Sequence, residues 1–428
     1  MTPEIKQRID KICHGEVPEG YQRTFLGIAP KSWDKSRIDK ICRLSSGSTP
    51  RRDAVENFAG DILWVTSGEL KRRTIEDTRE KISETAVVNS HLEIYDPGTV
   101  VIAIYGLEAA GIRGTVSIIG KQCTISQACM AFTEFKGIDK EFFYYWYLNN
   151  GQVIGLRYAQ GTKQQNLSTD IVGSFPICFP GQGEQQKIAA ILTTQDRVIE
   201  LKEKRLAGKQ RQKKYLMQQL LTGKKRLPGF SGAWKNIKLC EVLSERKEKN
   251  IEQNLRICSV AVQKGVIDQI EHLGRSYAAS DTSNYSVAHY GDIIYTKSPT
   301  GDFLYGIVKQ NLLQETVAVS PLYGVFTPMT FGLGYFLHTY FQSAICAQNY
   351  LSPIVQKGAK NTINITNDTF ISSKLYLPLD VEEQKAIADT FIAADREIDL
   401  LRQDIEQEKQ KKKALMQLLL TGIVRVKP

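Results

Sequence analysis

The sequence predicts an α+β protein in which two mixed α/β domains are separated by two long helices, and in which this domain-plus-helix unit occurs twice as a pseudo-twofold internal repeat. Three observations predict this fold. Two stretches about 200 residues apart repeat each other, both carry the apolar spacing of long helices, and the segments between them are rich in strand-forming residues. A chain of 428 residues is also long enough to form more than one domain core.

The repeat is a duplication of a whole domain together with its helix. The segment Glu-Gln-Gln-Lys-Ile-Ala begins at Glu184 and returns as Glu-Gln-Lys-Ala-Ile-Ala at Glu383, 199 residues later. The segment Leu-Met-Gln-Gln-Leu-Leu-Thr-Gly ends at Gly223 and returns, with one change, at Gly422, again 199 residues later. Because both ends of the repeated stretch share one offset, the copies align without a gap. This period is far longer than the roughly 20–50 residues of solenoid and propeller repeats.

The same sequence pattern precedes each copy of the domain. Trp33 and Trp234 both follow an approach segment that contains Pro and Gly, and both precede apolar residues at matching spacing. We therefore expect five parts in chain order: an N-terminal helix and approach segment (1–33), a first domain (34–183), a central spacer helix (184–223), a second domain (224–382) and a C-terminal spacer helix (383–428).

Both repeated stretches are expected to be long helices. Apolar residues recur every seven positions, no Pro interrupts them, and Gly223 and Gly422 suit the left-handed residue that closes a helix. A helix of about 40 residues is roughly 60 Å long and needs a partner, so we expect the two to pack on each other, although Gly208 weakens the first. Lys213 and Lys412 at seam positions argue against a fully apolar interface between the two helices. The alternative to a helix pair is that these apolar residues belong to an ordinary helix-bundle core. The expected packing residues are Leu192, Ile199, Leu206, Leu216, Leu220, Phe391, Ile398, Leu401, Ile405, Leu415 and Leu419.

The segments between the helices show strand and helix patterns in the same order. Runs of β-branched and aromatic residues opened by turn residues predict strands at 60–65, 100–105 and 291–295. Helical stretches are expected at 141–148 and 334–341, in corresponding places of the two halves. Outside such landmarks the two domains barely resemble each other. We therefore expect the two domains to share one backbone fold and to differ in their surface residues.

The charge of the chain favours a polyanionic partner. The formal net charge is +10, and Lys and Arg side chains neutralise phosphates and release counterions. The first long helix is itself strongly basic; a solvated helix face is the favoured interpretation, and contact with a DNA backbone is the alternative. The basic residues of this helix are Lys202, Lys204, Arg205, Lys209, Arg211, Lys213 and Lys214.

Polar, basic loops that contain Gly are the candidates for contacts to nucleic acid. Arg and Lys reach guanine acceptors, Gln and Asn pair with adenine edges, and Ser or Thr can hold phosphates. A single loop of this kind is more often a solvated turn, but such loops recur around Gly161 and Gly358 at similar distances before the two helices. The candidate DNA-contacting residues are Ser48, Thr49, Arg51, Arg52, Thr66, Lys71, Arg72, Tyr105, Gly161, Thr162, Lys163, Gln164, Lys297, Ser298, Thr300, Lys357, Gly358, Lys360 and Asn361.

The sequence lacks the signatures of an enzyme or of a membrane protein. It contains no phosphate-loop motif, no paired metal-ligand spacing among its five histidines, and no Asn-Pro-Pro-Phe-type motif of DNA amino-methyltransferases. Its eight cysteines include no C-x-x-C pair, which favours free thiols over a zinc site or disulfides. No apolar run reaches the ~18 residues of a membrane span. We expect a cytoplasmic, non-catalytic protein with no cofactor, no metal and no membrane partner.

These residues resemble the specificity (S) subunits of type I restriction–modification systems, and the resemblance covers essentially the whole chain. Its most specific carriers are the duplicated helix starts at Glu184 and Glu383 and the twin Leu-Met-Gln-x-Leu-Leu-Thr-Gly helix ends at Gly223 and Gly422. Shorter pieces, such as Gly-Asp-Ile-Leu-Trp-Val-Thr from Gly60, are similar to pieces of the family's target-recognition domains.

The resemblance implies a DNA-reading role without catalysis. It implies that the helices form an antiparallel coiled coil that holds two target-recognition domains apart, and that each domain reads half of a bipartite, asymmetric target on double-stranded DNA. It also implies two methyltransferase (modification) subunits as partners, joined by restriction subunits. Two half-sites that are one turn of DNA apart have their centres about 34–36 Å apart. The partner methyltransferase must turn an adenine out of the DNA duplex.

Two other classes of protein remain open. A coiled-coil interaction protein with a basic surface would bind nucleic acid in a salt-dependent but sequence-indifferent way. An autonomous enzyme is the third reading, and methyl transfer by the chain alone would favour it. The target sequence, the gap length and the contacts to particular bases do not follow from these residues. For residues 5–15 we expect packing against the C-terminal helix, which would complete a circular arrangement.

Overall fold

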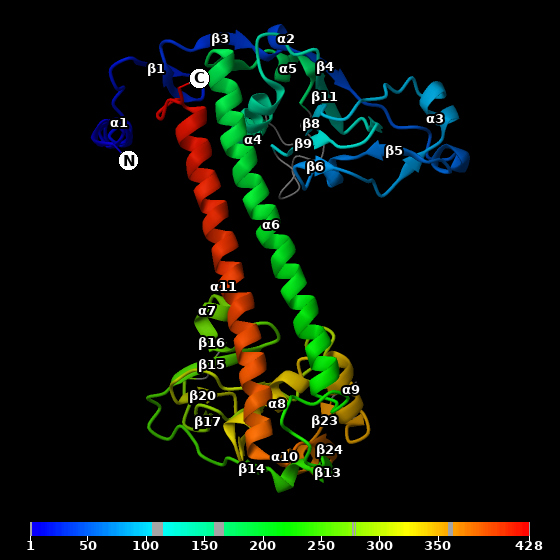
Figure 1. The fold of residues 1–428 in the computed structure, drawn as a ribbon, viewed down its shortest axis with the longest axis vertical. Coiled ribbons are helices and arrows are strands. Elements are labelled where there is room, and N and C mark those ends of the chain that lie inside the picture. The colour runs from blue at the N-terminus through cyan, green and yellow to red at the C-terminus, as the bar shows by residue number, and fades with distance from the viewer. Residues whose placement is uncertain are drawn as a thin grey trace. The chain divides into compact units, whose positions relative to one another are not determined.

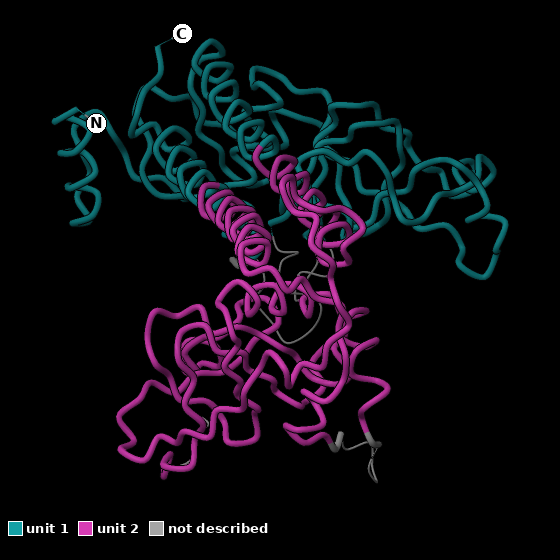
Figure 2. Tube along the Cα trace, turned by 60° about the horizontal axis from the view of Figure 1, so that its bottom comes forward, with its two compact units in different colours: residues 1–201, 405–428 teal, residues 202–404 magenta. Residues whose placement is uncertain are grey.

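The structure is a computed structural model that describes residues 2–104, 114–157, 167–275, 278, 280–357 and 363–427. The chain forms two compact units, coloured separately in Figure 2. Unit 1 comprises residues 1–201 and 405–428, and unit 2 comprises residues 202–404. Each unit therefore contains one strand-rich domain and one half of each long helix.

Two uninterrupted helices account for the repeated stretches (Figure 1). α6 is Gln182–Leu220 and α11 is Val381–Leu420, and both begin two residues ahead of the expected starts. Both end as predicted, because Gly223 and Gly422 follow with φ angles of 68° and 69°. These angles lie in the left-handed region that residues with a Cβ rarely adopt.

Unit 1 is built from short strands and short helices around α6 and α11. Its strands are β1 (Tyr21–Thr24), β2 (Gly27–Pro30), β3 (Asp34–Arg37), β4 (Arg43–Ser46), β5 (Ile62–Val65), β6 (Thr74–Ile75), β7 (Lys81–Ile82), β8 (Val100–Ala103), β9 (Val116–Ile119), β10 (Cys123–Ile125), β11 (Cys129–Thr133) and β12 (Pro176–Phe179). Its short helices are α1 (Pro3–Cys13), α2 (Ile38–Ile41), η1 (Val55–Phe58), η2 (Ser67–Glu69), α3 (Glu84–Asn89), α4 (Lys140–Arg157) and α5 (Thr169–Gly173). The strands form sheets of order β4-β11-β8-β9-β6, β10-β5-β7, β1-β2 and β12-β3.

Unit 2 has a similar content. Its strands are β13 (Lys235–Lys238), β14 (Leu243–Glu245), β15 (Arg256–Ala261), β16 (Gly265–Asp268), β17 (Ser286–Ala288), β18 (Ile293–Tyr295), β19 (Val308–Gln310), β20 (Val317–Val319), β21 (Gly324–Pro328), β22 (Gln356–Lys357), β23 (Ile363–Asn364) and β24 (Lys374–Leu377). Its short helices are η3 (Leu239–Glu241), α7 (Gln269–Leu273), α8 (Phe331–Tyr340), α9 (Ala344–Leu351) and α10 (Asn367–Ser372). The sheet orders are β14-β21-β18-β19, β16-β15-β20-β17, β13-β24 and β22-β23.

The two domains share one topology. The order β4-β11-β8-β9 in unit 1 repeats as β14-β21-β18-β19 in unit 2, and the parallel pair β5 and β10 repeats as β15 and β20. The register also matches, because Val100 on β8 is opposite Ile118 and Ile293 on β18 is opposite Gln310. The helical stretches predicted at 141–148 and 334–341 lie in α4 and α8, which both follow the equivalent strands β11 and β21. The structure thus confirms a duplicated scaffold.

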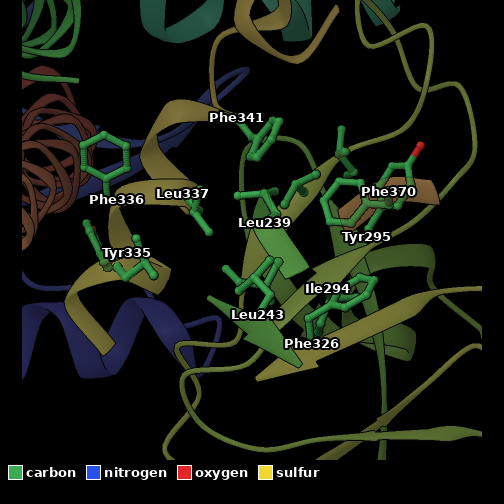
Figure 3. Packing of buried hydrophobic residues seen from close by; sticks show 14 of the residues in the cluster. Leu239, Leu243, Ile294, Tyr295, Phe326, Tyr335, Phe336, Leu337, Phe341 and Phe370 are labelled. Carbon is green, nitrogen blue, oxygen red and sulfur yellow. The ribbon is translucent and has the colours of Figure 1, made fainter. Parts of the chain in front are cut away.

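Each unit has its own apolar core. In unit 1, β8 is buried on both faces over all four residues, which explains why its sequence is a continuous apolar run and not an alternating one. In unit 2, Tyr295 of β18 stacks on Phe370 of α10 with 4.5 Å between the ring centroids, and Figure 3 shows the two rings side by side. Apolar residues at both ends of each long helix join these cores, including Leu192 and Leu419 in unit 1 and Leu220 and Phe391 in unit 2. Burial of such side chains stabilises each unit by about 1.5–3 kcal/mol per residue.

The described residues include no helix that is both long and apolar enough to cross a membrane.

Candidate nucleic-acid interface

The described residues that flank two loops of unit 1 are neighbours. The backbone N–H of Leu167 donates to the carbonyl of Ile104 at 3.1 Å. Gly114 packs so closely on α4 that an added Cβ would lie 2.2 Å from the backbone nitrogen of Gln152. The connections 105–113 and 158–166 therefore leave the scaffold at adjacent points. The candidates Tyr105, Gly161, Thr162, Lys163 and Gln164 lie outside the described residues.

Unit 2 has a hairpin at the position equivalent to residues 105–113. The backbone N–H of Thr296 donates to Ile307 across the hairpin at 3.1 Å, and Thr300 and Phe303 exchange backbone hydrogen bonds nearer the tip. Lys297 has a φ of 55°, and Gly306 faces it so closely that an added Cβ would lie 2.9 Å from the Lys297 nitrogen. The two strands of the hairpin thus approach each other closely near its base. The tip exposes the predicted residues Ser298 and Thr300.

The second loop of unit 2 connects the paired strands β22 and β23. The strands β22 and β23 flank residues 358–362, so Lys357 lies on β22, whereas Gly358, Lys360 and Asn361 lie outside the described residues. The chain then reaches Asn367, whose side-chain amide donates to Glu245 at 2.5 Å. Burial lowers the pKa of Lys297, and the nearby Glu245 carboxylate opposes that shift. Glu245 therefore lies near Lys297 of the hairpin and accepts a hydrogen bond from Asn367 at the start of α10.

Ser48 and Thr66 lie around the end of β10. The backbone N–H of Ser48 donates to Ile125 at 3.3 Å, and that of Ser126 donates to Val65, the residue before Thr66, at 2.8 Å. Thr66 caps η2 together with Glu69. The predicted residues Ser48, Thr49 and Thr66 are thus gathered at one edge of the sheet.

The two arginines that follow Ser48 and Thr49 are already paired within the domain. Arg52 lies over the rings of Phe58 and Trp64 and forms a two-point ion pair with Glu80. Arg51, which is far more exposed, pairs with Asp53 at 2.7 Å. Arg52 therefore fastens this loop to the domain, and Arg51 is the more accessible of the two for a phosphate.

Lys71 and Arg72 form a second, separate group beside β9. Both side chains are exposed, and the hydroxyl of Ser117 on β9 donates to the carbonyl of Arg72 at 2.7 Å. The next residue, Arg73, turns inward and pairs with Glu141 of α4. Sequence reasoning placed Lys71 and Arg72 among the DNA-contacting candidates but missed the inward role of Arg73.

Buried carboxylates explain why both helix starts repeat. Glu184 accepts two hydrogen bonds from Arg425, at 2.8 and 2.7 Å, and Glu383 forms the same two-point pair with Arg226. Glu383 also accepts a hydrogen bond from Trp234 Nε1 at 3.1 Å. The two arginines were missed in the sequence, although Arg425 lies 199 residues after Arg226, the same offset as the repeat.

The basic residues of α6 divide into two sets: Lys204, Arg211 and Lys214 are exposed, as a solvated face requires, and others pair with acidic residues of α11. In unit 2, Lys202 pairs with Asp404 at 2.8 Å, and Arg205 and Lys209 both pair with Glu397, at 3.4 and 2.8 Å. Neither sequence-based interpretation, a solvated face or a DNA-backbone contact, included this helix-to-helix pairing. Charge complementarity of this kind fixes which helix faces pair.

Residues 2–32 contact the segment that follows α11, although α1 itself buries no residue, so the predicted packing of residues 5–15 against the helix is limited to one side-chain contact. Arg8 of α1 donates to the carbonyl of Ile423 at 3.1 Å, and the Tyr21 hydroxyl donates to the carbonyl of Gly422 at 2.7 Å. Arg425 adds a hydrogen bond to Ser32 at 3.1 Å. The chain's N-terminal and C-terminal segments are thereby joined within unit 1.

The family of the chain follows from comparison with known proteins. A model of the type I restriction modification DNA specificity domain matches residues 30–208 and again residues 234–410. The chain belongs to this family. Each match covers one domain of the duplicated scaffold together with part of a long helix, so the specificity domain occurs twice in the chain. As a type I specificity protein, the chain serves the recognition of DNA sequence.

Relatives with curated names include two specificity subunits from Methanocaldococcus jannaschii. The MjaVIII specificity subunit is 23% identical over 93% of this chain and 94% of its own length. The MjaIX specificity subunit is 29% identical, but the match spans only 43% of this chain and 42% of that protein. The EcoR124I/EcoR124II specificity subunit of Escherichia coli is 24% identical over 40% of this chain and 43% of its own length.

Two solved structures have the same fold. The type I restriction–modification S subunit from M. genitalium matches with a TM-score of 0.57 and 12% identity, over 90% of this chain and 96% of that one. A chain from a structure described as the basis of complex assembly and conformational transition of the type I R-M system matches with a TM-score of 0.52 and 14% identity, over 92% and 99%. At these identities the likeness establishes the fold alone.

Proposed function

We propose that this type I specificity protein reads a bipartite, asymmetric target on double-stranded DNA. Unit 1 would read one half and unit 2 the other, each with its loop pair: residues 105–113 and 158–166 in unit 1, and residues 296–307 and 358–362 in unit 2. The chain itself would carry out no catalysis. It would direct two methyltransferase subunits, and restriction subunits that join them, to the target.

The observation that carries the proposal is one scaffold with two different loop pairs. The strand order and register repeat between the units, whereas the equivalent loops differ in sequence and length. Two copies of one reader would favour a symmetric target, and two different loop pairs favour two different half-sites. Basic and hydroxyl side chains at the unit 2 hairpin suit contacts to both phosphates and base edges.

The contacts between α6 and α11 support an antiparallel coiled coil as the spacer. In unit 1, Gln195 donates to the Glu408 carboxylate at 2.6 Å, while Glu184, which lies earlier on α6, meets Arg425, which lies later in the chain. In unit 2, Lys202 meets Asp404 and Arg226 meets Glu383. Partners therefore run in opposite chain directions within each unit. The apolar residues every seven positions would supply the seam.

The long helices also offer a surface for the methyltransferase subunits. In unit 1 an open groove of about 430 Å³ is lined by Lys187, Ala190, Ile191, Thr194, Gln195, Lys411 and Leu415. On α6 and α11, Leu201 and Leu400 are more than half exposed, at 54% and 56%. Exposed apolar side chains on a helical spacer are suited to burial by a partner.

The test is to map adenine methylation across the genome of cells that make this chain together with its partner methyltransferase subunits. The proposal predicts methylation within one motif that has two defined halves and an unread gap. Methylation without a bipartite motif, or DNA binding by the complex that depends on salt but not on sequence, would instead indicate a sequence-indifferent nucleic-acid scaffold. Methyl transfer by the purified chain alone, with S-adenosylmethionine, would contradict the non-catalytic role.

A further inference from the structure

A partly buried charge cluster lies where the sheet of unit 1 meets the long helices. We call it the Asp196 cluster. Asp196 of α6 pairs with Lys412 of α11 at 2.6 Å and accepts a hydrogen bond from the Tyr145 hydroxyl of α4 at 2.7 Å. Arg73, which precedes β6, pairs with Glu141 of α4 and places its Nε atom 3.7 Å from Asp196. The cluster therefore joins both long helices, α4 and the sheet.

Unit 2 has an equivalent cluster around Asp395. Asp395 of α11 pairs with Lys213 of α6 and accepts a hydrogen bond from the Tyr335 hydroxyl of α8 at 2.9 Å. Lys213 also donates to Gln342 at 2.9 Å. Lys309 of β19 is only 4% exposed. The next residue, Gln310, donates its backbone N–H to His338 of α8 at 2.9 Å, and Gln342 contacts both His338 and Lys213. This Asp395 cluster again joins both long helices, a helix of the domain and the sheet.

The clusters are related by the internal repeat. Asp395 lies 199 residues after Asp196, and Lys412 lies 199 residues after Lys213. Each aspartate is therefore met by the lysine of the other helix. The tyrosines come from α4 and α8, which follow equivalent strands. Two charged residues placed twice in this reciprocal way are not explained by chance surface pairing.

The two units differ in the residue of the sheet that supplies a cation. By strand register, the position of Lys309 on β19 is occupied on β9 by Ser117, whose side chain is buried and donates to Arg72. In unit 1 the cation comes instead from Arg73 on the neighbouring β6 side of the sheet, because the Ile118 N–H donates to the Arg73 carbonyl at 2.7 Å. Both units thus bring a basic residue of the sheet to the long-helix side of the domain by different routes: Arg73 lies 3.7 Å from Asp196, and Lys309 lies beside Gln310, which is hydrogen-bonded to α8.

Both sheet cations lie next to candidate DNA contacts. Arg73 directly follows Lys71 and Arg72 in the chain. Lys309 lies on the strand that leaves the hairpin carrying Ser298 and Thr300. A change in either cation therefore shifts a DNA-facing segment relative to the helices of its own unit.

We propose that Arg73 and Lys309 are positioning residues for DNA recognition, each fixing the orientation of its recognition sheet on the long helices through the Asp196 or Asp395 cluster. They touch no base in this proposal. They set the angle at which the loop pair of their own unit meets its half-site. This angle in turn determines the sequence specificity for that half-site and for the length of the adjoining gap. The inference rests on the proposed function.

The test compares Arg73→Met and Lys309→Met in the full chain, expressed with its partner methyltransferase subunits, by genome-wide mapping of methylated adenine. Arg73→Met is expected to lower methylation of native sites by about tenfold to a hundredfold, the scale of small misplacements. New methylation should appear at sites with an altered first half or gap, while the second half stays unchanged. Lys309→Met should produce the same change in the other half. Arg79→Met, at an exposed arginine of unit 1, is the matched control and should leave the motif unchanged.

A second variant separates positioning from folding. The conservative variant Arg73→Lys keeps a cation beside Glu141 and Asp196. It is expected to keep methylation of native sites within about threefold of the unmodified chain, well short of the tenfold loss of Arg73→Met. Thermal unfolding of each purified complex is measured alongside.

The outcomes are distinct. Relaxed reading of one half by Arg73→Met, with the native motif kept by Arg73→Lys, supports the proposal. An unchanged motif in both Met variants, loss of both halves together, or an Arg73→Lys variant that keeps thermal stability but not the motif would overturn it. If the unmodified chain produces no bipartite motif, it is the proposed function that fails, and that result is visible before any variant is made.

Discussion

At the scale of single residues, the glutamates at the start of the two repeated segments form buried polar contacts. Glu383 is 1% exposed at its side chain, and it joins Arg226 and Trp234. Glu184 holds Arg425 in the same way. A buried carboxylate retains its charge only where cations and N–H donors replace water, so each of these glutamates requires its arginine.

Replacement of Glu383 by Gln is therefore expected to destabilise unit 2. The change leaves Arg226 without its counter-charge in a partly buried site, which costs about 3 kcal/mol by analogy with other broken buried pairs. The midpoint of urea unfolding of the full chain checks this. Glu382→Gln, at the exposed neighbouring position, is the control. Equal midpoints for the two variants would contradict the assigned role of Glu383.

Lys309 leads to a prediction about pH. Burial, with a smaller contribution from Lys213, lowers its pKa from 10.5 to about 8, and Asp395 opposes the shift. The unfolded chain therefore binds this proton more tightly than the folded chain, so the charge costs folding free energy below about pH 8, and the cost disappears as the pH rises towards 10.5. Lys309→Met should accordingly raise the free energy of unfolding near pH 7 by about 1–3 kcal/mol.

The advantage of that variant should shrink between pH 8 and pH 10. Tyrosine ionisation in the same range is common to both chains and cancels in the comparison. Urea unfolding of the unmodified chain and the variant at several pH values measures the difference. If the difference in the free energy of unfolding between the two chains stayed constant with pH, Lys309 would have the same pKa in the folded and the unfolded chain, and this prediction would be wrong.

At the scale of elements, the long helices and their ends were predictable because their signals are local. The spacing of apolar residues predicted both helix starts to within two residues, and the terminal glycines marked both helix ends; the C-terminal part expected as helix (383–428) was too long, because α11 ends at Leu420. The equivalent helices α4 and α8 were predicted for the same reason. The ion pairs between α6 and α11 were not predicted, because they depend on which faces of two distant segments meet.

Two glycine positions of the long helices should respond in opposite directions to the same change. Gly208 is inside α6, and an added Cβ would meet nothing within 4 Å, so Gly208→Ala is expected to stabilise the chain by about 0.5–1 kcal/mol. Gly422 has a positive φ, and a Cβ there would lie 2.5 Å from Pro30 and 2.9 Å from Trp33. Gly422→Ala is therefore expected to destabilise the chain by more than about 1 kcal/mol. Thermal unfolding of both variants checks the pair, and a change of the same sign in both would contradict the assigned helix ends.

At the scale of the whole molecule, the sequence predicted the duplicated architecture but only part of the candidate interface. The shared offset of 199 residues predicted two domains of one design, and the equivalent strand orders confirm it. Single loop residues could not be ranked, because Arg51 and Arg52 look alike in sequence. Only the fold shows that Arg52 is held over two aromatic rings. Arg73 and Lys309 could not be paired from sequence either, since they come from different strands.

The central claim is that each unit reads its own half of one target. The most direct measurement is genome-wide adenine methylation in cells that make the partner methyltransferase with one of three chains: the unmodified chain, a Lys71→Ala/Arg72→Ala variant of unit 1, or a Ser298→Ala/Thr300→Ala variant of unit 2. We predict a bipartite motif in the first case, a change confined to one half in the second, and a change confined to the other half in the third. If both variants altered the same half, or each altered both halves together, the claim would be contradicted.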